Sequence, residues 1–143
     1  MLTMRYAPRF GLAAVLALTG CGGEAAEAAA DPPAVVEETG EEGIGRITLT
    51  EHAAERLALE TAVVERAGTG LAVPFAAVFW DAAGQAWTYT NPEPLVFVRQ
   101  TVAVERIDGD RALLTDGPAA GSSVVIVGVA ELYGAETGVG GGH

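Results

Sequence analysis

The chain of 143 residues contains no lysine and only one cysteine, Cys21. All eight basic residues are arginines, set against 19 acidic residues, so the net charge is −11. Nucleic-acid binding requires a concentrated basic patch. The sequence has no such patch, and we expect no nucleic-acid partner. A lone cysteine also cannot form an internal disulfide. The length suits one domain and a tail, not separate substrate and cofactor domains.

Residues that commonly carry catalysis are equally scarce. His52 and His143 are the only histidines. Neither has a histidine, cysteine or carboxylate at the spacing of metal ligands. The serines Ser122 and Ser123 fall in a predicted turn without the glycines of a nucleophile elbow. No glycine-rich phosphate loop opens a predicted helix. We therefore expect a protein that is not an enzyme, with no metal and no cofactor.

The first 20 residues have the features of an export signal. Arg5 and Arg9 precede residues 11–18, which are almost purely Ala, Val and Leu, and no acidic residue lies before Cys21. This apolar run is about half of the roughly 20 residues that a membrane-spanning helix needs. The signal ends in the sequence Leu18-Thr19-Gly20-Cys21.

This ending resembles the bacterial lipoprotein box. The resemblance implies cleavage before Cys21 and a diacylglycerol group on its sulfur, with Leu18, Thr19 and Gly20 as the recognition residues. The protein would then be exported and anchored to a bacterial membrane, facing the periplasm or the extracellular side. Bacterial lipoproteins carry more than one acyl chain, which stable anchoring requires. A chance cysteine after an ordinary signal peptide is the alternative.

Residues 21–45 are predicted to be a lipid-anchored, acidic, disordered linker. Residues 22–45 hold seven carboxylates and neither a basic nor an aromatic residue. Such a segment buries too little apolar area to offset its ordering entropy. As a flexible coil these 24 residues would average roughly 27 Å end to end, and fully stretched roughly 80 Å. The carboxylates lack the spacing and turn glycine of a calcium loop.

The pattern from Arg46 to Glu136 predicts an all-β domain, a small sandwich or partly open barrel, with one short helix. The helix is expected over Glu51 to Leu59, capped by Thr50 or by Thr48 in a capping box with Glu51. Residues 137–143 are predicted to be a flexible glycine-rich tail. Strands are expected at residues 46–50, 61–64, 71–73, 76–80, 85–90, 95–107, 111–115 and 124–129, with rigid or glycine-containing connectors at 66–70, 81–84, 91–94, 108–109 and 116–121.

Aromatic residues on neighbouring strands normally pair across the sheet and fill the core. Phe79 and Trp80 are adjacent, so on a strand they would point to opposite faces, and at least one would be exposed. The exposed one is a candidate contact for a partner. Leu132 and Tyr133 are further candidates, and packing in the core is an equally good interpretation of each of these residues.

Several segments resemble, in order, the carboxy-terminal, membrane-proximal region of the periplasmic adaptor subunits (membrane fusion proteins) of RND-type efflux pumps. The resemblance covers roughly Arg46 to Glu136 and is interrupted near Arg66. The segments that carry it are Val73-Pro74-Phe75-Ala76-Ala77-Val78, Trp87-Thr88-Tyr89, Val102 to Asp110, Gly117 to Val127, and Ala130-Glu131-Leu132-Tyr133-Gly134-Ala135-Glu136.

The departure from this family is large. Its members carry a lipoyl domain split by a long helical hairpin, whereas here only a few residues separate Arg66 from Pro74. The resemblance therefore implies docking of the β domain on a membrane transporter, without the bridging of two membranes. The metal ligands of metal-efflux adaptors do not carry over, since Met1 and Met4 lie in the signal. The alternatives are a standalone ligand- or ion-binding lipoprotein and an adaptor remnant without a partner.

Overall fold

The computed structural model describes residues 31–138, which are mostly β structure in two antiparallel sheets. This agrees with the predicted fold class. The elements are β1 (Ala34–Glu38), β2 (Gly45–Leu49), α1 (Glu51–Arg56), β3 (Glu60–Val63), β4 (Glu65–Ala67), β5 (Gly70–Pro74), the 3₁₀ turn η1 (Phe75–Ala77), β6 (Phe79–Trp80), β7 (Ala86–Glu93), β8 (Val96–Thr101), β9 (Ala103–Asp108), β10 (Arg111–Asp116), β11 (Ser123–Val127) and α2 (Val129–Thr137).

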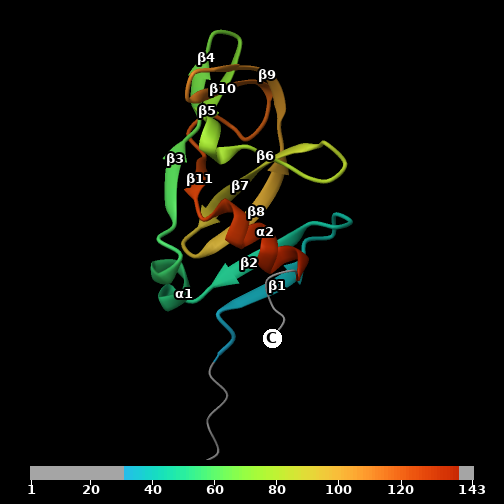
Figure 1. Ribbon diagram of the computed structural model, residues 1–143, viewed down its shortest axis with the longest axis vertical. Coiled ribbons are helices and arrows are strands. Elements are labelled where there is room, and N and C mark those ends of the chain that lie inside the picture. Colours follow the sequence, from blue (N-terminus) through green and yellow to red (C-terminus); the bar gives the residue numbers. More distant parts are fainter. Residues whose placement is uncertain (1–30, 139–143) are drawn as a thin grey trace, which may run out of the picture. The chain divides into compact units, whose positions relative to one another are not determined.

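The larger sheet has the strand order β1-β2-β8-β7-β11-β3, with the short β6 also pairing β7. The smaller sheet has the order β4-β5-β10-β9. In Figure 1 the smaller sheet lies at the end of the domain opposite α1 and β1, and α2 lies beside β2 and β8. The C-terminal helix packs on the larger sheet, where it contacts β1 and β2.

The larger sheet is buried on both faces where β11 crosses it. Val124 belongs to an apolar cluster with residues of the smaller sheet, such as Val73 and Leu114. Its neighbour Val125 belongs to a second cluster, under the helices, with Leu132 of α2. Alternate residues of a strand face opposite sides of a sheet, so a strand covered on both sides must be apolar throughout. This explains the continuous apolar run that predicted a buried strand here.

The segment predicted as one long strand, residues 95–107, is broken at Val102. β8 pairs within the larger sheet and β9 within the smaller one. The Val102 amide donates to the carbonyl of Ala86, and its side chain is buried between the sheets. The chain therefore changes sheets at this residue, close to the bend predicted near Gln100.

The prediction that residues 21–45 form a disordered linker is wrong for its second half. Residues Ala34–Glu38 form β1, which pairs with β2 from Ala34↔Leu49 to Glu38↔Gly45. The prediction relied on burial, and four of the five β1 residues are indeed exposed. Backbone hydrogen bonds to β2 order them instead. The β domain thus begins at Ala34 rather than at Arg46.

Four other local predictions are corrected. Residues 76–80 are not one strand, because Phe75–Ala77 form the turn η1 directly after Pro74. Asn91–Pro94 are not a separate connector, because β7 continues to Glu93. A second helix, α2, follows Gly128 and was not predicted; it takes in Thr137 of the predicted tail. The first helix is shorter than expected, and Thr50 caps it, since its Oγ1 accepts from the Ala53 amide at 3.1 Å.

No helix among residues 31–138 is long and apolar enough to span a membrane. The predicted signal peptide, the recognition residues Leu18, Thr19 and Gly20, the lipid attachment at Cys21, the linker up to residue 30 and the tail from residue 139 all lie outside the described residues.

Candidate functional site

Of the four predicted contact residues, Trp80 is exposed, Phe79 and Tyr133 are partly buried, and Leu132 is buried. Trp80 is 47 % exposed. Phe79 turns the other way and stacks on Tyr89, with ring centroids 5.3 Å apart. Tyr133 lies against Phe79 at the same centroid distance, tilted by 56°. Leu132 is fully buried. Its prediction as a partner contact is therefore wrong, because the apolar side of α2 is packed on the sheet.

Trp80 has an exposed aromatic neighbour that the sequence did not reveal. Phe75 of η1 is 42 % exposed, and its ring centroid lies 6.2 Å from that of Trp80. The Phe75 amide donates to the carbonyl of Asp110, which fixes the start of η1 against the smaller sheet. We call Phe75 and Trp80 the aromatic pair. Two large apolar rings side by side in water are typical of surfaces that bind a partner.

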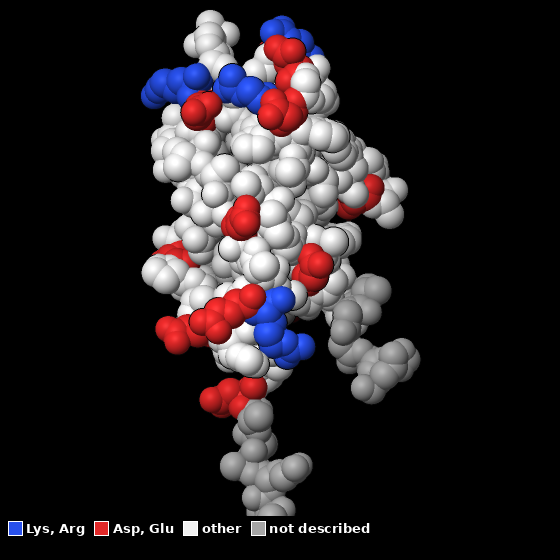
Figure 2. All heavy atoms as spheres, turned by 60° about the vertical axis from the view of Figure 1, so that its left-hand side comes forward, with Lys and Arg blue, Asp and Glu red and all other residues white. Residues whose placement is uncertain are grey.

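The surface shows no concentrated basic patch on the face seen in Figure 2. Basic side chains appear there near the two ends of the domain, next to acidic ones. Of the described arginines, Arg46 pairs with Glu93 and Arg111 pairs with Glu65. These two positive charges are therefore partly neutralised.

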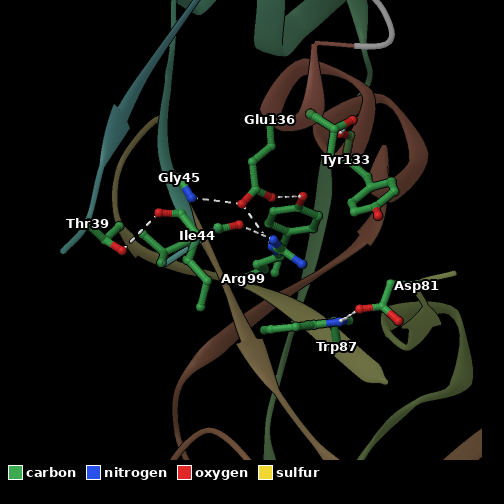
Figure 3. Close-up of polar contacts among 12 residues, drawn as sticks. Thr39, Ile44, Gly45, Asp81, Trp87, Arg99, Tyr133 and Glu136 are labelled. Atoms are coloured by element: carbon green, nitrogen blue, oxygen red, sulfur yellow. Dashed lines mark hydrogen bonds and ion pairs between the residues drawn. The ribbon is translucent and has the colours of Figure 1, made fainter. Parts of the chain in front are cut away.

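Beneath α2 lies a buried polar network centred on Glu136 (Figure 3). Its Oε1 accepts hydrogen bonds from the Gly45 amide and from Arg99 Nε, both at 2.8 Å. Its Oε2 accepts from the Tyr89 hydroxyl at 2.5 Å. The side chain of Glu136 is 3 % exposed and that of Arg99 is 10 % exposed. One carboxylate thus ties α2 to β2, β7 and β8.

The guanidinium of Arg99 is held on several sides. It donates to the carbonyl of Gly43, and it lies 4.3 Å from the ring centroid of Trp87 and 5.9 Å from that of Tyr133. Cation–π contacts of this kind gain strength where water is excluded. Arg99 therefore connects the β1–β2 turn to α2 as well as to the sheet.

Two ionisable groups of this region have shifted pKa values. Burial, and then the hydrogen bond to Glu136, raise the pKa of the Tyr89 hydroxyl far above its ordinary value. The hydrogen bond from Trp87 Nε1, 2.8 Å from Asp81 Oδ2, followed by the bond from the Gln85 amide, lowers the pKa of Asp81. At neutral pH, Tyr89 is thus a neutral donor and Asp81 an anionic acceptor.

The network has a structural geometry. Both carboxylate oxygens of Glu136 accept hydrogen bonds from protein donors. Within residues 31–138, no three His, Cys, Asp or Glu side chains are grouped so as to hold a metal ion. His52 is exposed on α1. No local pattern predicts this network, because its members are far apart in the chain and the helix carrying Glu136 was not predicted.

Comparison of the chain with protein-family models, with curated proteins and with solved structures found no match.

Proposed function

We propose that this chain is a non-enzymatic, lipid-anchored protein of the bacterial cell envelope that docks on a membrane transporter through the aromatic pair. The exposed pair Phe75 and Trp80 is the observation that carries this proposal. The export signal ending at Cys21 and the resemblance of residues 46–136 to the membrane-proximal region of efflux adaptors support it.

Because β1 is folded, the tether between Cys21 and the domain is shorter than the sequence predicted. Only the 12 residues 22–33 separate Cys21 from Ala34. Covalent geometry limits their reach to about 40 Å, and a flexible coil of this length averages about 19 Å. A domain tethered in this way stays near the bilayer surface. Its partners are then proteins of the same membrane, which favours a transporter over a free periplasmic protein.

The aromatic pair has the right chemistry for such a contact. Complete burial of a large apolar side chain contributes about 1.5–3 kcal/mol, and roughly half of Trp80 is still exposed. Covering it with a partner therefore contributes about 1 kcal/mol, with a similar term from Phe75. Trp is also among the residue types most often found at the energetic centre of interfaces.

Site-specific photocrosslinking in cells tests this proposal. A photoreactive phenylalanine analogue at position 80 should capture an integral membrane transporter subunit. The matched control is position 107, because Ile107 is 43 % exposed, similarly apolar, and lies on β9. Cys21→Ser should abolish the crosslink from position 80 by releasing the protein from the membrane.

Capture of no membrane protein from position 80 would refute docking through the aromatic pair. So would capture of the same proteins in equal yield from positions 80 and 107. Recovery of a small-molecule ligand with the purified protein, and of no membrane protein, would instead favour the standalone binding lipoprotein.

A further inference from the structure

β1 forms an edge of the larger sheet, and its outer side has no neighbouring strand among residues 31–138. The Pro33 carbonyl accepts from the Thr50 amide, and the Thr39 amide donates to the Ile44 carbonyl. The backbone N–H and C=O groups of successive strand residues point to alternate edges of the strand. The N–H and C=O groups of residues 33, 35, 37 and 39 therefore point towards β2. Those of Ala34, Val36 and Glu38 point away from the sheet.

Apolar side chains flank this open edge. Val35 is 45 % exposed and Val36 is 41 % exposed, and as neighbours on a strand they lie on opposite faces of the sheet. On the face of Val36, a groove of about 470 Å³ separates β1 and the β1–β2 turn from the end of α2 at Glu136 and Thr137. An edge with free backbone groups, beside apolar side chains and a groove, is the surface to which an extended peptide adds as a strand.

The acidic residues of β1 and its turn determine which kind of peptide segment can pair with this edge. Glu37, Glu38, Glu41 and Glu42 lie on β1 and its turn, and none forms an ion pair with another described residue. Arg99, which reaches the turn at Gly43, is already paired with Glu136. A second copy of this chain would bring four more carboxylates to the same edge. A strand with basic side chains would neutralise the four that are there.

We infer that the outer edge of β1 is a binding site for an extended basic segment of a partner protein, which adds to the larger sheet as a further strand. Its backbone pairs with Ala34, Val36 and Glu38. Apolar side chains of the segment pack on Val35 and Val36, and its Lys or Arg side chains contact the four glutamates. This site is separate from the aromatic pair and does not rest on docking to a transporter.

A capped peptide of alternating valine and lysine, seven residues long, is the probe. It is titrated into the mature chain carrying Cys21→Ser, with binding followed by calorimetry and by amide NMR shifts. The expected result is binding that weakens with added salt and shifts the amides of Ala34, Val36 and Glu38. The same peptide with glutamate in place of lysine should not bind.

Two proline variants separate strand addition from simple charge attraction. Val36→Pro removes an outward amide and leaves pairing with β2 intact, as proline is tolerated on the open side of an edge strand. It should lower the affinity about tenfold, the equivalent of about one hydrogen bond and the contacts next to it. Val35→Pro removes an amide that faces Thr48 on β2, so it should also abolish the hydrogen-exchange protection of β1.

A second probe leaves the protein unchanged. The valine–lysine peptide with backbone N-methyl groups on alternate residues cannot form the ladder, and it should bind at least about tenfold more weakly. The inference is overturned if the unmethylated peptide does not bind, or if N-methylation and Val36→Pro leave its affinity unchanged. It is also overturned if the chain without peptide dimerises and Val36→Pro abolishes the dimer, since the occupant would then be a second copy.

Discussion

Replacing Glu136 by alanine should destabilise the domain more than any change at an exposed carboxylate. The substitution removes the acceptor of three hydrogen bonds, from Gly45, Tyr89 and Arg99. It also leaves the guanidinium of Arg99, which is 10 % exposed, without its counter-ion. Breaking a buried ion pair by removing one partner costs about 3–5 kcal/mol. We expect a loss in this range.

Urea unfolding of the mature chain carrying Cys21→Ser measures this loss as a change in the free energy of unfolding. Glu131→Ala is the matched control, because Glu131 lies on the same helix and is exposed. Glu131→Ala should lower the free energy of unfolding by no more than about 0.5 kcal/mol. Glu136→Gln keeps the shape of the side chain, and with its amide oxygen towards Gly45 and Arg99 its NH2 group can donate to the Tyr89 hydroxyl oxygen. It should cost less than Glu136→Ala, because the charge and the acceptor for the Tyr89 hydroxyl are lost but the other two hydrogen bonds keep their acceptor.

A double-mutant cycle with Arg99→Met isolates the pair. Since each single variant leaves the other partner buried and unpaired, the double variant should cost less than the sum of the two by at least about 1 kcal/mol. A loss of stability below about 1 kcal/mol for Glu136→Ala, or an additive cycle, would show that this buried pair does not hold α2 on the sheet.

Three further outcomes follow from single features. Thr88→Val should leave stability unchanged or raise it by up to about 1 kcal/mol in urea unfolding, because the Thr88 Oγ1 is buried and has no hydrogen-bond partner within residues 31–138; a clear loss would reveal a partner. Gly70→Ala should destabilise the domain by about 1–3 kcal/mol, because the new Cβ would lie 2.3 Å from the carbonyl oxygen of Leu114; an unchanged midpoint would contradict this close approach. The NMR signal of the Trp87 indole N–H should titrate at a lower pH than an ordinary aspartate does, because the hydrogen bonds from Trp87 and Gln85 lower the pKa of Asp81. The stability from the Trp87 bond is present at neutral pH and is lost as the pH falls through this lowered pKa. Asp81→Asn should abolish the titration.

The sequence predicted the strands whose pattern is set by local chemistry. β2, β3, β10 and β11 lie within about two residues of the expected ranges. Asp81 to Gly84 turns as predicted, since the Asp81 carboxylate accepts from the amides of Ala83 and Gln85. In these segments the apolar alternation and the turn residues agree with the final packing.

The errors occur where tertiary contacts decide the structure. β1 is exposed and acidic, and it is ordered by the backbone hydrogen bonds that it forms with β2. α2 follows its N-cap Gly128, which has a φ of 95°. The apolar residues at the start of α2 continue the apolar pattern of β11, so the sequence predicted a strand there. Burial under the sheet and the bonds of Glu136 fix this helix, and neither is visible in the local sequence.

The candidate contacts divide in the same way. The alternation of Phe79 and Trp80 predicted that one would be exposed, and Trp80 is. It could not predict Phe75 as a neighbour, because the turn η1 brings that ring to Trp80. For Leu132 and Tyr133 the sequence left contact with a partner and packing in the core equally open, and packing of α2 on the sheet places Leu132 in the core.

The proposed function depends above all on acylation of Cys21, and intact-mass spectrometry of the protein purified from membranes measures this directly. We expect a chain that begins at residue 21 and carries the added mass of a diacylglycerol thioether and a further acyl chain. A chain with an unmodified Cys21 thiol, recovered in the aqueous phase of a detergent extraction, would contradict this expectation.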